Sequence, residues 1–207
     1  MADFNLVYTL EGKIYINLTN RCTNNCVFCI RAIKDDVVGA DLFLKTENFT
    51  SQEVIEQLKK FENQMSDEIV FCGYGEPIIK LDILKEVAKY IKDNYKGVKI
   101  RVNTNGQGNL IHKRDIVPEL IGLVDRVSIS LNGENEEEYE RISKPNLKNT
   151  YTAVKEFISE CAKAGIDTTA TVVSGYKGYE VNVKNCEEIT KFLGAKFRER
   201  PWIENGY

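Results

Sequence analysis

The stretch CTNNCVFC, residues 22–29, carries three of the six cysteines of the 207-residue chain in the spacing C-x3-C-x2-C. A cubic iron–sulfur cluster normally takes one cysteine thiolate for each of its four irons. A cluster held by Cys22, Cys26 and Cys29 alone therefore leaves one iron without a protein ligand. Because an open coordination position indicates chemistry rather than scaffolding, as at catalytic zinc, the spacing predicts a reactive metal centre.

Other interpretations of these cysteines are weaker. Spacings of four and three residues also place side chains on one helix face, where cysteine packs as a small hydrophobe. The flanking residues 19–21 and 23–25, which read TNR and TNN, form helices poorly and loops readily. A structural zinc site usually takes a second group of ligands, whereas the only histidine, His112, lies far along the chain.

The composition indicates a soluble globular protein, with 43% hydrophobic and 29% charged residues. We expect residues 1–207 to form a single domain with one core. The net charge of −3 gives no sign of a basic surface for nucleic acid. No apolar run approaches the roughly 18–20 residues that span a membrane. Because the N-terminus carries no secretory signal, six cysteines favour free thiols and a cytoplasmic location.

Strand-like and helix-like segments alternate along the chain. A short N-terminal hairpin is expected at about residues 5–20, and TSQE at residues 50–53 is a capping box that begins a helix. The expected parallel strands are residues 13–20, 68–72, 99–104, 126–131, 168–174 and 196–200. The expected helices are residues 50–61, 81–95, 116–123, 150–164 and 183–193.

Six strands joined by five crossover segments predict an α/β fold. Right-handed crossovers wind such strands into a curved parallel sheet. Six units are fewer than the eight that usually close a barrel, so we expect a partial, laterally open (β/α)6 barrel of parallel strands. An open doubly wound sheet is the alternative. In both folds the catalytic and binding residues lie at the carboxyl ends of the strands.

With Phe28 just before its last cysteine, C-x3-C-x2-C resembles the signature of radical SAM enzymes. In that family the open iron chelates S-adenosylmethionine (SAM), and one electron splits it to a 5′-deoxyadenosyl radical that abstracts hydrogen from a substrate. The resemblance implies an oxygen-sensitive [4Fe-4S] cluster on Cys22, Cys26 and Cys29. It also implies SAM as cofactor and an external flavodoxin- or ferredoxin-like electron donor. Radical SAM cores resemble the six-unit barrel.

The resemblance also implies SAM contacts at the ends of the expected strands. Residues 73–77, GYGEP, resemble the family's GGEP segment, whose backbone carbonyls receive the amino group of SAM; an ordinary Gly/Pro turn is the other interpretation. Asn132 stands where the family often has Asp. The predicted contacts are Gly73, Tyr74, Gly75, Glu76, Pro77, Asn103, Asn105, Ser130, Asn132, Val173 and Gly175.

Alternation within two strands supports a polar barrel interior. Ser128, Ser130 and Asn132 share one strand face, and Asn103 and Asn105 share a face of the preceding strand. Buried hydroxyls and amides require polar partners, so a polar interior indicates a polar ligand. A serine-rich sheet edge and an Asn-Gly turn at residues 105–106 are the structural alternatives.

Three arginines are candidates for substrate contact: Arg31, Arg198 and Arg200. Arg198 and Arg200 share a face of the last strand, where they could hold a carboxylate or phosphate or simply blunt an edge strand with charge. Residues 30–50 form a connection longer than usual, and we expect this inserted loop to cover the cluster and shape the substrate site. Cys72 is expected to pack in the core, because a fourth thiolate would close the reactive iron.

The cysteine motif, the loop and residues 71–77 look most similar to a small radical SAM subgroup named for its association with TatD-type nucleases. That resemblance implies a possible TatD-type partner but no defined reaction. A glycyl-radical-type activase acting on a protein is an alternative within the enzymes. A non-catalytic electron-transfer or sensor protein is the alternative outside them, although such clusters usually have four protein ligands. The substrate, small molecule or macromolecule, stays open.

Overall fold

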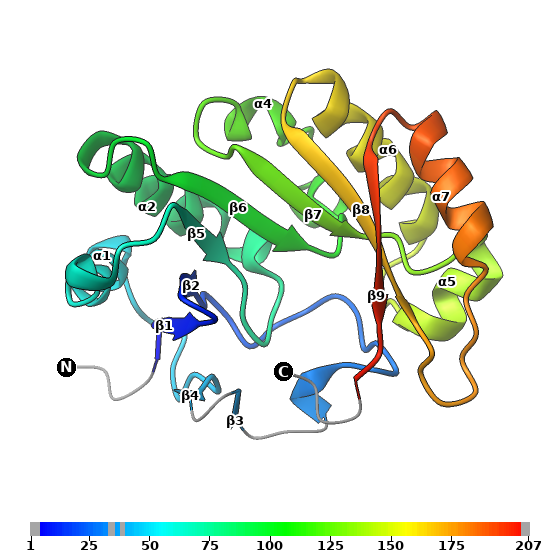
Figure 1. The fold of residues 1–207 in the computed structure, drawn as a ribbon, viewed down its shortest axis with the longest axis horizontal. Helices are drawn as coiled ribbons and strands as arrows, with labels where there is room; N and C mark the ends of the chain where they lie inside the picture. Colours follow the sequence, from blue (N-terminus) through cyan, green and yellow to red (C-terminus); the bar gives the residue numbers. More distant parts are fainter. Residues whose placement is uncertain (1–4, 33–35, 38–39, 204–207) are drawn as a thin grey trace.

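A curved seven-stranded sheet organises the computed structural model, which describes residues 5–32, 36–37 and 40–203 (Figure 1). The strand order is β1-β2-β5-β6-β7-β8-β9. Only β1 is antiparallel, as the other half of a hairpin with β2. The strands are β1 Val7–Leu10, β2 Lys13–Ile16, β5 Glu68–Phe71, β6 Lys99–Thr104, β7 Arg126–Ser130, β8 Asp167–Ser174 and β9 Lys196–Pro201.

The order of the six parallel strands follows the chain without a reversal. A doubly wound sheet requires a point where the order reverses, so that alternative is wrong. In the described part of the chain β1 and β9, the two ends of the sheet, do not pair, and the barrel stays open between them. The predicted partial (β/α)6 barrel is confirmed.

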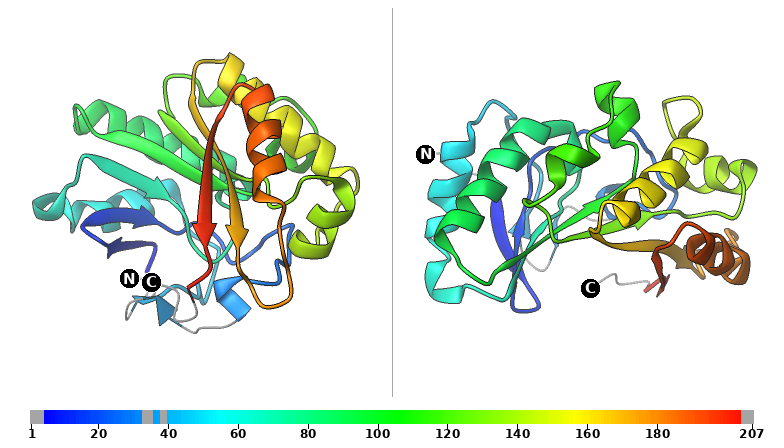
Figure 2. Two further views of the ribbon diagram at one scale, coloured as in Figure 1. Left: turned by 45° about the vertical axis from the view of Figure 1, so that its right-hand side comes forward. Right: turned by 90° about the horizontal axis from the view of Figure 1, so that it is seen from above.

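Helices cover one side of this sheet, as the views in Figure 2 show. They are α1 Ser51–Lys59, α2 Leu81–Asn94, α3 Gly108–His112, α4 Val117–Leu120, α5 Glu136–Ser143, α6 Thr150–Lys163 and α7 Val183–Phe192. Short 3₁₀ helices are η1 Ile30–Ala32, η2 Glu62–Gln64 and η3 Pro77–Lys80, and a small second sheet pairs β3 Asp36–Val37 with β4 Ala40–Asp41. No helix among the described residues combines the length and apolarity needed to cross a membrane.

Several element boundaries differ from the sequence prediction. The strand expected at residues 13–20 ends at Ile16, and the helix expected at residues 116–123 shrinks to α4. Pro118 lies in the first turn of that helix, and Gly122, with φ +79°, ends the segment. The helices α3 and α5 were not predicted. The capping box of α1 is confirmed, because Thr50 and Glu53 exchange side-chain and backbone hydrogen bonds.

The two faces of the sheet differ in polarity. Toward the helices, alternate residues such as Phe71, Val102 and Ile129 are buried in one continuous apolar core. This is the alternation expected of strands whose other face lines a barrel interior. Cys161 and Cys186, on α6 and α7, are fully buried in the same core, as predicted.

The amino-terminal end of the barrel interior is crossed by a row of ion pairs. Glu68 on β5 bonds Lys13 at 3.0 Å, Arg101 at 3.2 Å and Arg126 at 2.9 Å. Burial alone raises the pKa of Glu68, but hydrogen bonds from Lys13 and Arg126 and the charge of Arg101 hold it below its usual range. The row continues through Asp167 on β8 to Lys196 on β9, so all six parallel strands contribute one charge.

Glu68→Gln should reduce the free energy of unfolding by about 2–3 kcal/mol, because it leaves three cations without their buried partner. Urea denaturation measures this change. Asp93→Asn, which breaks the exposed pair with Lys89 on α2, is the control and should cost less than about 0.5 kcal/mol. Equal effects of the two substitutions would contradict a structural role for the row.

Candidate functional site

The three cysteines lie on the segment that follows β2, at the carboxyl ends of the parallel strands. The first part of this segment is irregular, as predicted. Its second part tightens into turns, in which the Cys29 amide donates to the Cys26 carbonyl at 3.0 Å and the Ala32 amide to the Cys29 carbonyl at 2.9 Å. This turn begins η1 and brings Cys26 and Cys29 close together.

The cysteine segment is fastened to the end of α5, a helix that the sequence analysis missed. The Asn25 amide donates to the Ser143 carbonyl at 3.1 Å, and the Val27 amide donates to the Ile142 carbonyl at 3.0 Å. In return, the Asn146 amide donates to the Thr23 carbonyl at 2.9 Å. The backbone of residues 22–29 is therefore fixed by partners more than 110 residues away in sequence.

The three thiols are close enough to affect one another. Burial raises the pKa of Cys22 to about 11, with further contributions from Glu76 and Cys29. Burial likewise raises the pKa of Cys26 to about 12, and the charges of Cys22 and Cys29 add to it. Three thiolates in this setting repel one another, so their ionised forms require a neighbouring positive charge such as iron.

Polar donors already point at two of these sulfur atoms. The Asn24 amide donates to Cys22 Sγ at 3.4 Å, and Asn105 Nδ2 donates to the same sulfur at 3.8 Å. Ser143 provides a hydrogen bond to Cys26. Hydrogen bonds to cluster-ligating sulfurs are one of the means by which a protein tunes an iron–sulfur centre.

The donor set of this segment, three thiols on one turn, fits an iron–sulfur cluster. Among the described residues, no three His, Cys, Asp or Glu side chains converge tightly enough to hold one ion. A [4Fe-4S] cube instead binds each thiolate to a different iron, so its ligands surround a volume rather than a point. Cys22, Cys26 and Cys29 would hold such a cube, and no fourth ligand is needed.

The two glycines of residues 73–77 have a structural role besides the predicted approach to a ligand. A Cβ at Gly73 would lie 2.0 Å from Asn17 Oδ1, and a Cβ at Gly75 would lie 2.3 Å from the Thr19 carbonyl oxygen and 2.4 Å from that of Arg21. The close approach is therefore to the protein's own cysteine segment, whatever a ligand does. The Glu76 amide completes the contact by donating to the Arg21 carbonyl at 2.8 Å.

Glu76 is buried and joins two strand ends. Its carboxylate accepts hydrogen bonds from the Asn105 amide at 2.6 Å, from Thr104 Oγ1 at 2.8 Å and from the Ile78 amide at 3.1 Å. Burial raises the pKa of Glu76 to about 7 in spite of these donors. Pro77 follows as the first residue of η3, and Tyr74 is buried in a separate small apolar cluster.

Asn105 bonds a cysteine directly, and Asn132 is connected to another through Ser143. Asn105 Nδ2 donates to Thr23 Oγ1 at 2.8 Å as well as to Cys22. Asn132 adopts a left-handed backbone, φ +54°, and its side-chain Nδ2 donates to Ser143 Oγ at 3.2 Å. Asn132 therefore supports Ser143, the partner of Cys26, rather than simply continuing the interior face of β7.

The remaining predicted cofactor residues line the barrel interior and its mouth. Ser130 on β7 and Val173 on β8 are half-buried at the strand ends, and Gly175, with φ +74°, is exposed just beyond. Asn103 on β6 accepts a hydrogen bond from Arg101 at 2.9 Å and contacts Cys72. The structure does not test whether these residues touch SAM, and they stay predictions.

Cys72 lies elsewhere than predicted. It belongs to neither apolar cluster of the described residues but lies beside Asn103, facing the polar interior. Burial raises its pKa, while Asn103 and the charges of Arg200 and Arg101 oppose the rise. Packing in the core is therefore the wrong interpretation of this thiol.

The candidate substrate arginines have different surroundings. Arg31 Nη1 donates to the Asn20 carbonyl at 2.6 Å and so braces the cysteine segment. Arg198 and Arg200 extend from β9, with Arg198 Nη2 donating to Ser128 Oγ on β7 at 3.4 Å. Arg198 and Arg200 are exposed, at the open side of the barrel.

Two features near the cysteines escaped the sequence analysis. A buried polar group links Gln107 to Asn24 at 2.7 Å and to the Tyr139 hydroxyl at 2.8 Å, behind the cysteine segment. An aromatic wall also forms, with Phe28 against Tyr176 at 6.2 Å between ring centroids and Tyr176 against Trp202 at 4.9 Å. The sequence shows these residues only as isolated amides and aromatics on five separate segments.

The inserted loop at residues 30–50 is only partly within the described residues. Residues 33–35 and 38–39 lie outside them, so the predicted cover over the cluster is not tested there. Asn17 Nδ2 donates to the Leu42 carbonyl at 2.7 Å, and Asn20 bonds both the amide and carbonyl of Leu44. The end of the loop is thus clamped along the start of the cysteine segment.

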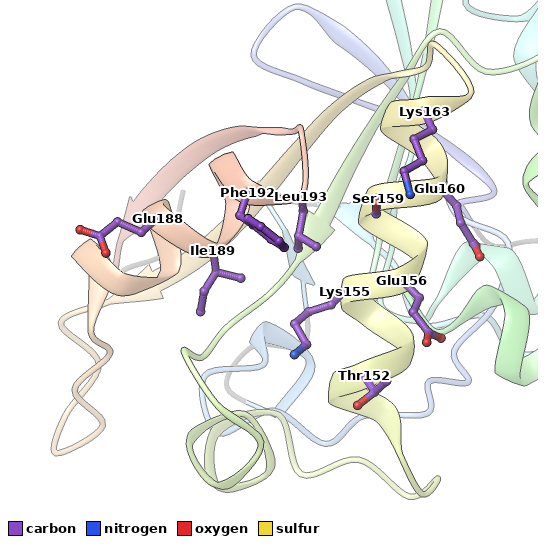
Figure 3. A pocket seen from close by; sticks show the side chains of 10 residues that line it. All are labelled: Thr152, Lys155, Glu156, Ser159, Glu160, Lys163, Glu188, Ile189, Phe192 and Leu193. Carbon is purple, nitrogen blue, oxygen red and sulfur yellow. The ribbon is translucent and has the colours of Figure 1, made fainter.

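A groove of about 660 Å³ lies on the opposite, helical side of the sheet (Figure 3). Its lining residues come from α6, α7 and the residue after α7, among them Thr152, Lys163 and Phe192. The strand-end residues that surround the cysteines contribute nothing to it. The groove is therefore separate from the candidate site.

Comparison with known proteins identifies the family. The model of the radical SAM superfamily matches residues 16–193. The chain belongs to the radical SAM superfamily. Members of this superfamily use a [4Fe-4S] cluster and SAM, the cofactors that the resemblance implied, and the cysteine segment fits the cluster.

Relatives share the radical SAM domain over part of their length. An uncharacterised protein of Methanocaldococcus jannaschii is 26% identical over 88% of this chain and 58% of its own length. A probable GTP 3′,8-cyclase of Methanothermobacter marburgensis is 27% identical over 75% of this chain and 45% of its own length. The chain thus spans about half the length of these curated relatives.

Solved structures confirm the fold of this radical SAM domain. SuiB of Streptococcus suis bound to S-adenosylmethionine superposes with a TM-score of 0.69 at 16% identity, over 92% of this chain and 40% of SuiB. The enzyme anSMEcpe with bound AdoMet gives a TM-score of 0.54 at 17% identity, over 90% of this chain and 62% of its own. At these identities the likeness shows the fold alone.

Gly75→Ala should displace the cysteine segment, because its Cβ would overlap two backbone carbonyls that cannot rotate away. We expect at least a fivefold loss of iron and sulfide bound after anaerobic reconstitution, measured against protein concentration. Gly97→Ala is the control: its φ of +88° strains alanine, but no atom lies within 4 Å of the new Cβ. Normal iron content in Gly75→Ala would contradict the role given to this contact.

Glu76→Gln should change how stability depends on pH. The folded pKa of about 7 lies above the ordinary carboxyl value, so wild-type stability is fully present below about pH 4.5 and falls as pH rises to about 7. Relative to Glu76→Gln, the apo wild type should lose on the order of 2–3 kcal/mol between pH 5 and pH 8, measured by urea denaturation. Glu187→Gln on α7, at a partly exposed residue paired with Lys191, is the control, and an equal pH trend there would oppose this assignment.

Proposed function

We propose that this radical SAM domain reductively cleaves S-adenosylmethionine and abstracts hydrogen from a substrate. The observation that carries the proposal is the clustering of Cys22, Cys26 and Cys29 on one braced segment at the carboxyl ends of the strands. When bound, the cluster and SAM supply one-electron cleavage to methionine and a 5′-deoxyadenosyl radical. The protein's own residues bind, orient and enclose the two cofactors.

The residues of the chain divide into two roles in this proposal. Asn105, the Asn24 amide and Ser143 bond the ligand sulfurs, and Asn132 and Glu76 hold those donors in place. SAM would lie across the barrel mouth between residues 73–77 and the end of β8. The proposed contacts there are Gly73, Tyr74, Gly75, Pro77, Asn103, Ser130, Val173 and Gly175.

The electron-transfer or sensor alternative is disfavoured by the same geometry. Such centres take four protein ligands in a shielded pocket. Here the neighbour that would have to complete the set, Cys72, is associated with Asn103 and two arginine charges rather than with the cysteine segment. The interior behind it is polar, which suits a polar ligand better than a closed redox centre.

Finer assignments rest on sequence resemblance. The CIR stretch at residues 29–31 and FCGYGEP at residues 71–77 support membership of the TatD-nuclease-associated subgroup, with a TatD-type nuclease as a possible partner. A flavodoxin- or ferredoxin-like protein would supply the electron. We propose residues 1–207 as one radical SAM core domain and the cytoplasm as its location. No particular observation favours a glycyl-radical activase.

Anaerobic reconstitution with iron and sulfide, followed by reduction in the presence of SAM, tests the proposal. We expect 5′-deoxyadenosine and methionine as products, detected by liquid chromatography and mass spectrometry. Cys26→Ala should reduce 5′-deoxyadenosine at least 100-fold, because one of the cluster ligands is lost. Cys72→Ala is the matched control and should keep the product. Full activity of Cys26→Ala would refute the proposal.

A further inference from the structure

Gln107 is a fully buried side chain behind the cysteine segment, on the residue that precedes α3. Its Nε2 donates to Asn24 Oδ1 at 2.7 Å and to the Tyr139 hydroxyl at 2.8 Å. Asn24 is also buried, and its Nδ2 donates to the same hydroxyl at 3.4 Å. The side-chain amide of Asn24 is therefore held at both its oxygen, by Gln107, and its nitrogen, by Tyr139.

The backbone of Asn24 is one of the hydrogen-bond donors to a cluster-binding cysteine. Its N–H donates to Cys22 Sγ at 3.4 Å. The next residue, Asn25, fastens the segment to the end of α5, because its N–H donates to the Ser143 carbonyl at 3.1 Å. The bond from Gln107 to Asn24 holds the segment from another direction, the connection between β6 and α3. The direction of the Asn24 N–H thus depends on both attachments.

Gln107 also supports the second donor to the same sulfur, by a different group. Its backbone N–H donates to Asn105 Oδ1 at 3.0 Å, and Asn105 Nδ2 donates to Cys22 Sγ at 3.8 Å. Every residue except proline keeps a backbone N–H. A substitution of Gln107 therefore removes its side-chain bond to Asn24 and leaves its backbone bond to Asn105.

The other half of the Gln107 amide has no stabilising role among the described residues. Its Oε1 is buried and has no hydrogen-bond partner in the part of the chain that the structure describes. A buried acceptor left unpaired costs about 1–3 kcal/mol. Methionine has a similar length and would remove that cost, so fold stability alone does not account for an amide here. What the amide adds is the hold of its Nε2 on Asn24.

We propose that Gln107 is a positioning residue that raises the reduction potential of the cluster, by aiming the Asn24 N–H at the Cys22 sulfur. The inference rests on the proposed function, which places the cluster on Cys22, Cys26 and Cys29. The couple takes one electron from the flavodoxin- or ferredoxin-like donor and breaks no bond in the protein. Hydrogen bonds to ligand sulfurs help to set this potential, and they favour the reduced cluster because it carries more negative charge.

Gln107→Met tests the role of the side chain. We expect the equilibrium constant for one-electron reduction to fall about threefold, which is about 28 mV at about 59 mV per tenfold change. The measurement is an anaerobic redox titration of the reconstituted protein, followed by electron paramagnetic resonance without SAM. Tyr139→Phe, which removes the acceptor of Asn24 Nδ2, should lower the potential too. Gln52→Met on α1, where Nε2 bonds Glu56 on an exposed surface, is the matched control and should keep the wild-type potential.

A double-mutant cycle separates positioning from general loosening of the fold. Asn24→Ala removes the side chain that Gln107 holds and keeps the backbone N–H. In that background Gln107→Met should leave the potential unchanged, because the two residues act through one contact. An equal fall in both backgrounds would overturn the proposal, and so would a wild-type potential in Gln107→Met. If Gln107→Met binds too little iron and sulfide to titrate, a wild-type potential in Tyr139→Phe overturns it instead.

The potential and the SAM reaction fail separately. A wild type that binds the cluster but forms no 5′-deoxyadenosine refutes the proposed function, while the effect of Gln107 on the potential still stands. Formation of 5′-deoxyadenosine together with an unshifted potential in Gln107→Met refutes the positioning role alone. A wild type that binds no cluster after reconstitution refutes both.

Discussion

The buried carboxylate of Glu76 is the interaction on which the site depends. The backbone amide of Glu76 donates to the Arg21 carbonyl of the cysteine segment. Its carboxylate accepts a hydrogen bond from the Asn105 amide at the end of β6. Asn105 in turn bonds the sulfur of Cys22. A buried carboxylate is costly to ionise, and burial raises its pKa to about 7. The hydrogen bonds of Glu76 offset that cost, because they join the segments that follow β2, β5 and β6.

Local signals were sufficient to predict the fold. Alternating β-branched residues marked the parallel strands, and Asn-Gly or Gly stops marked their ends. The helix α4 was overestimated because Pro118 and Gly122 confine it to one turn. The helix α5, residues 136–143, was missed because it is short and strongly acidic. Its buried face, which includes Tyr139 and Ile142, is specified by contact with the cysteine segment rather than by local pattern.

The sequence predicted the cluster-binding cysteines but not the residues that position them. Cys22, Cys26 and Cys29 stand together in sequence, so their spacing carries the information. Their hydrogen-bond partner Ser143 comes from a distant helix, and no sequence motif connects the two. The glycines at residues 73–77 also allow a close approach to the cysteine segment, which the sequence did not show, because sequence indicates that a backbone must approach something without showing what.

The barrel interior is crossed by ion pairs at one end and is open along one side. Ion pairs from all six parallel strands cross its amino-terminal end, and the braced cysteine segment occupies the other. Between β1 and β9 the described strands leave it open. Reactive intermediates require exclusion of water, and electrostatic interactions strengthen as water leaves.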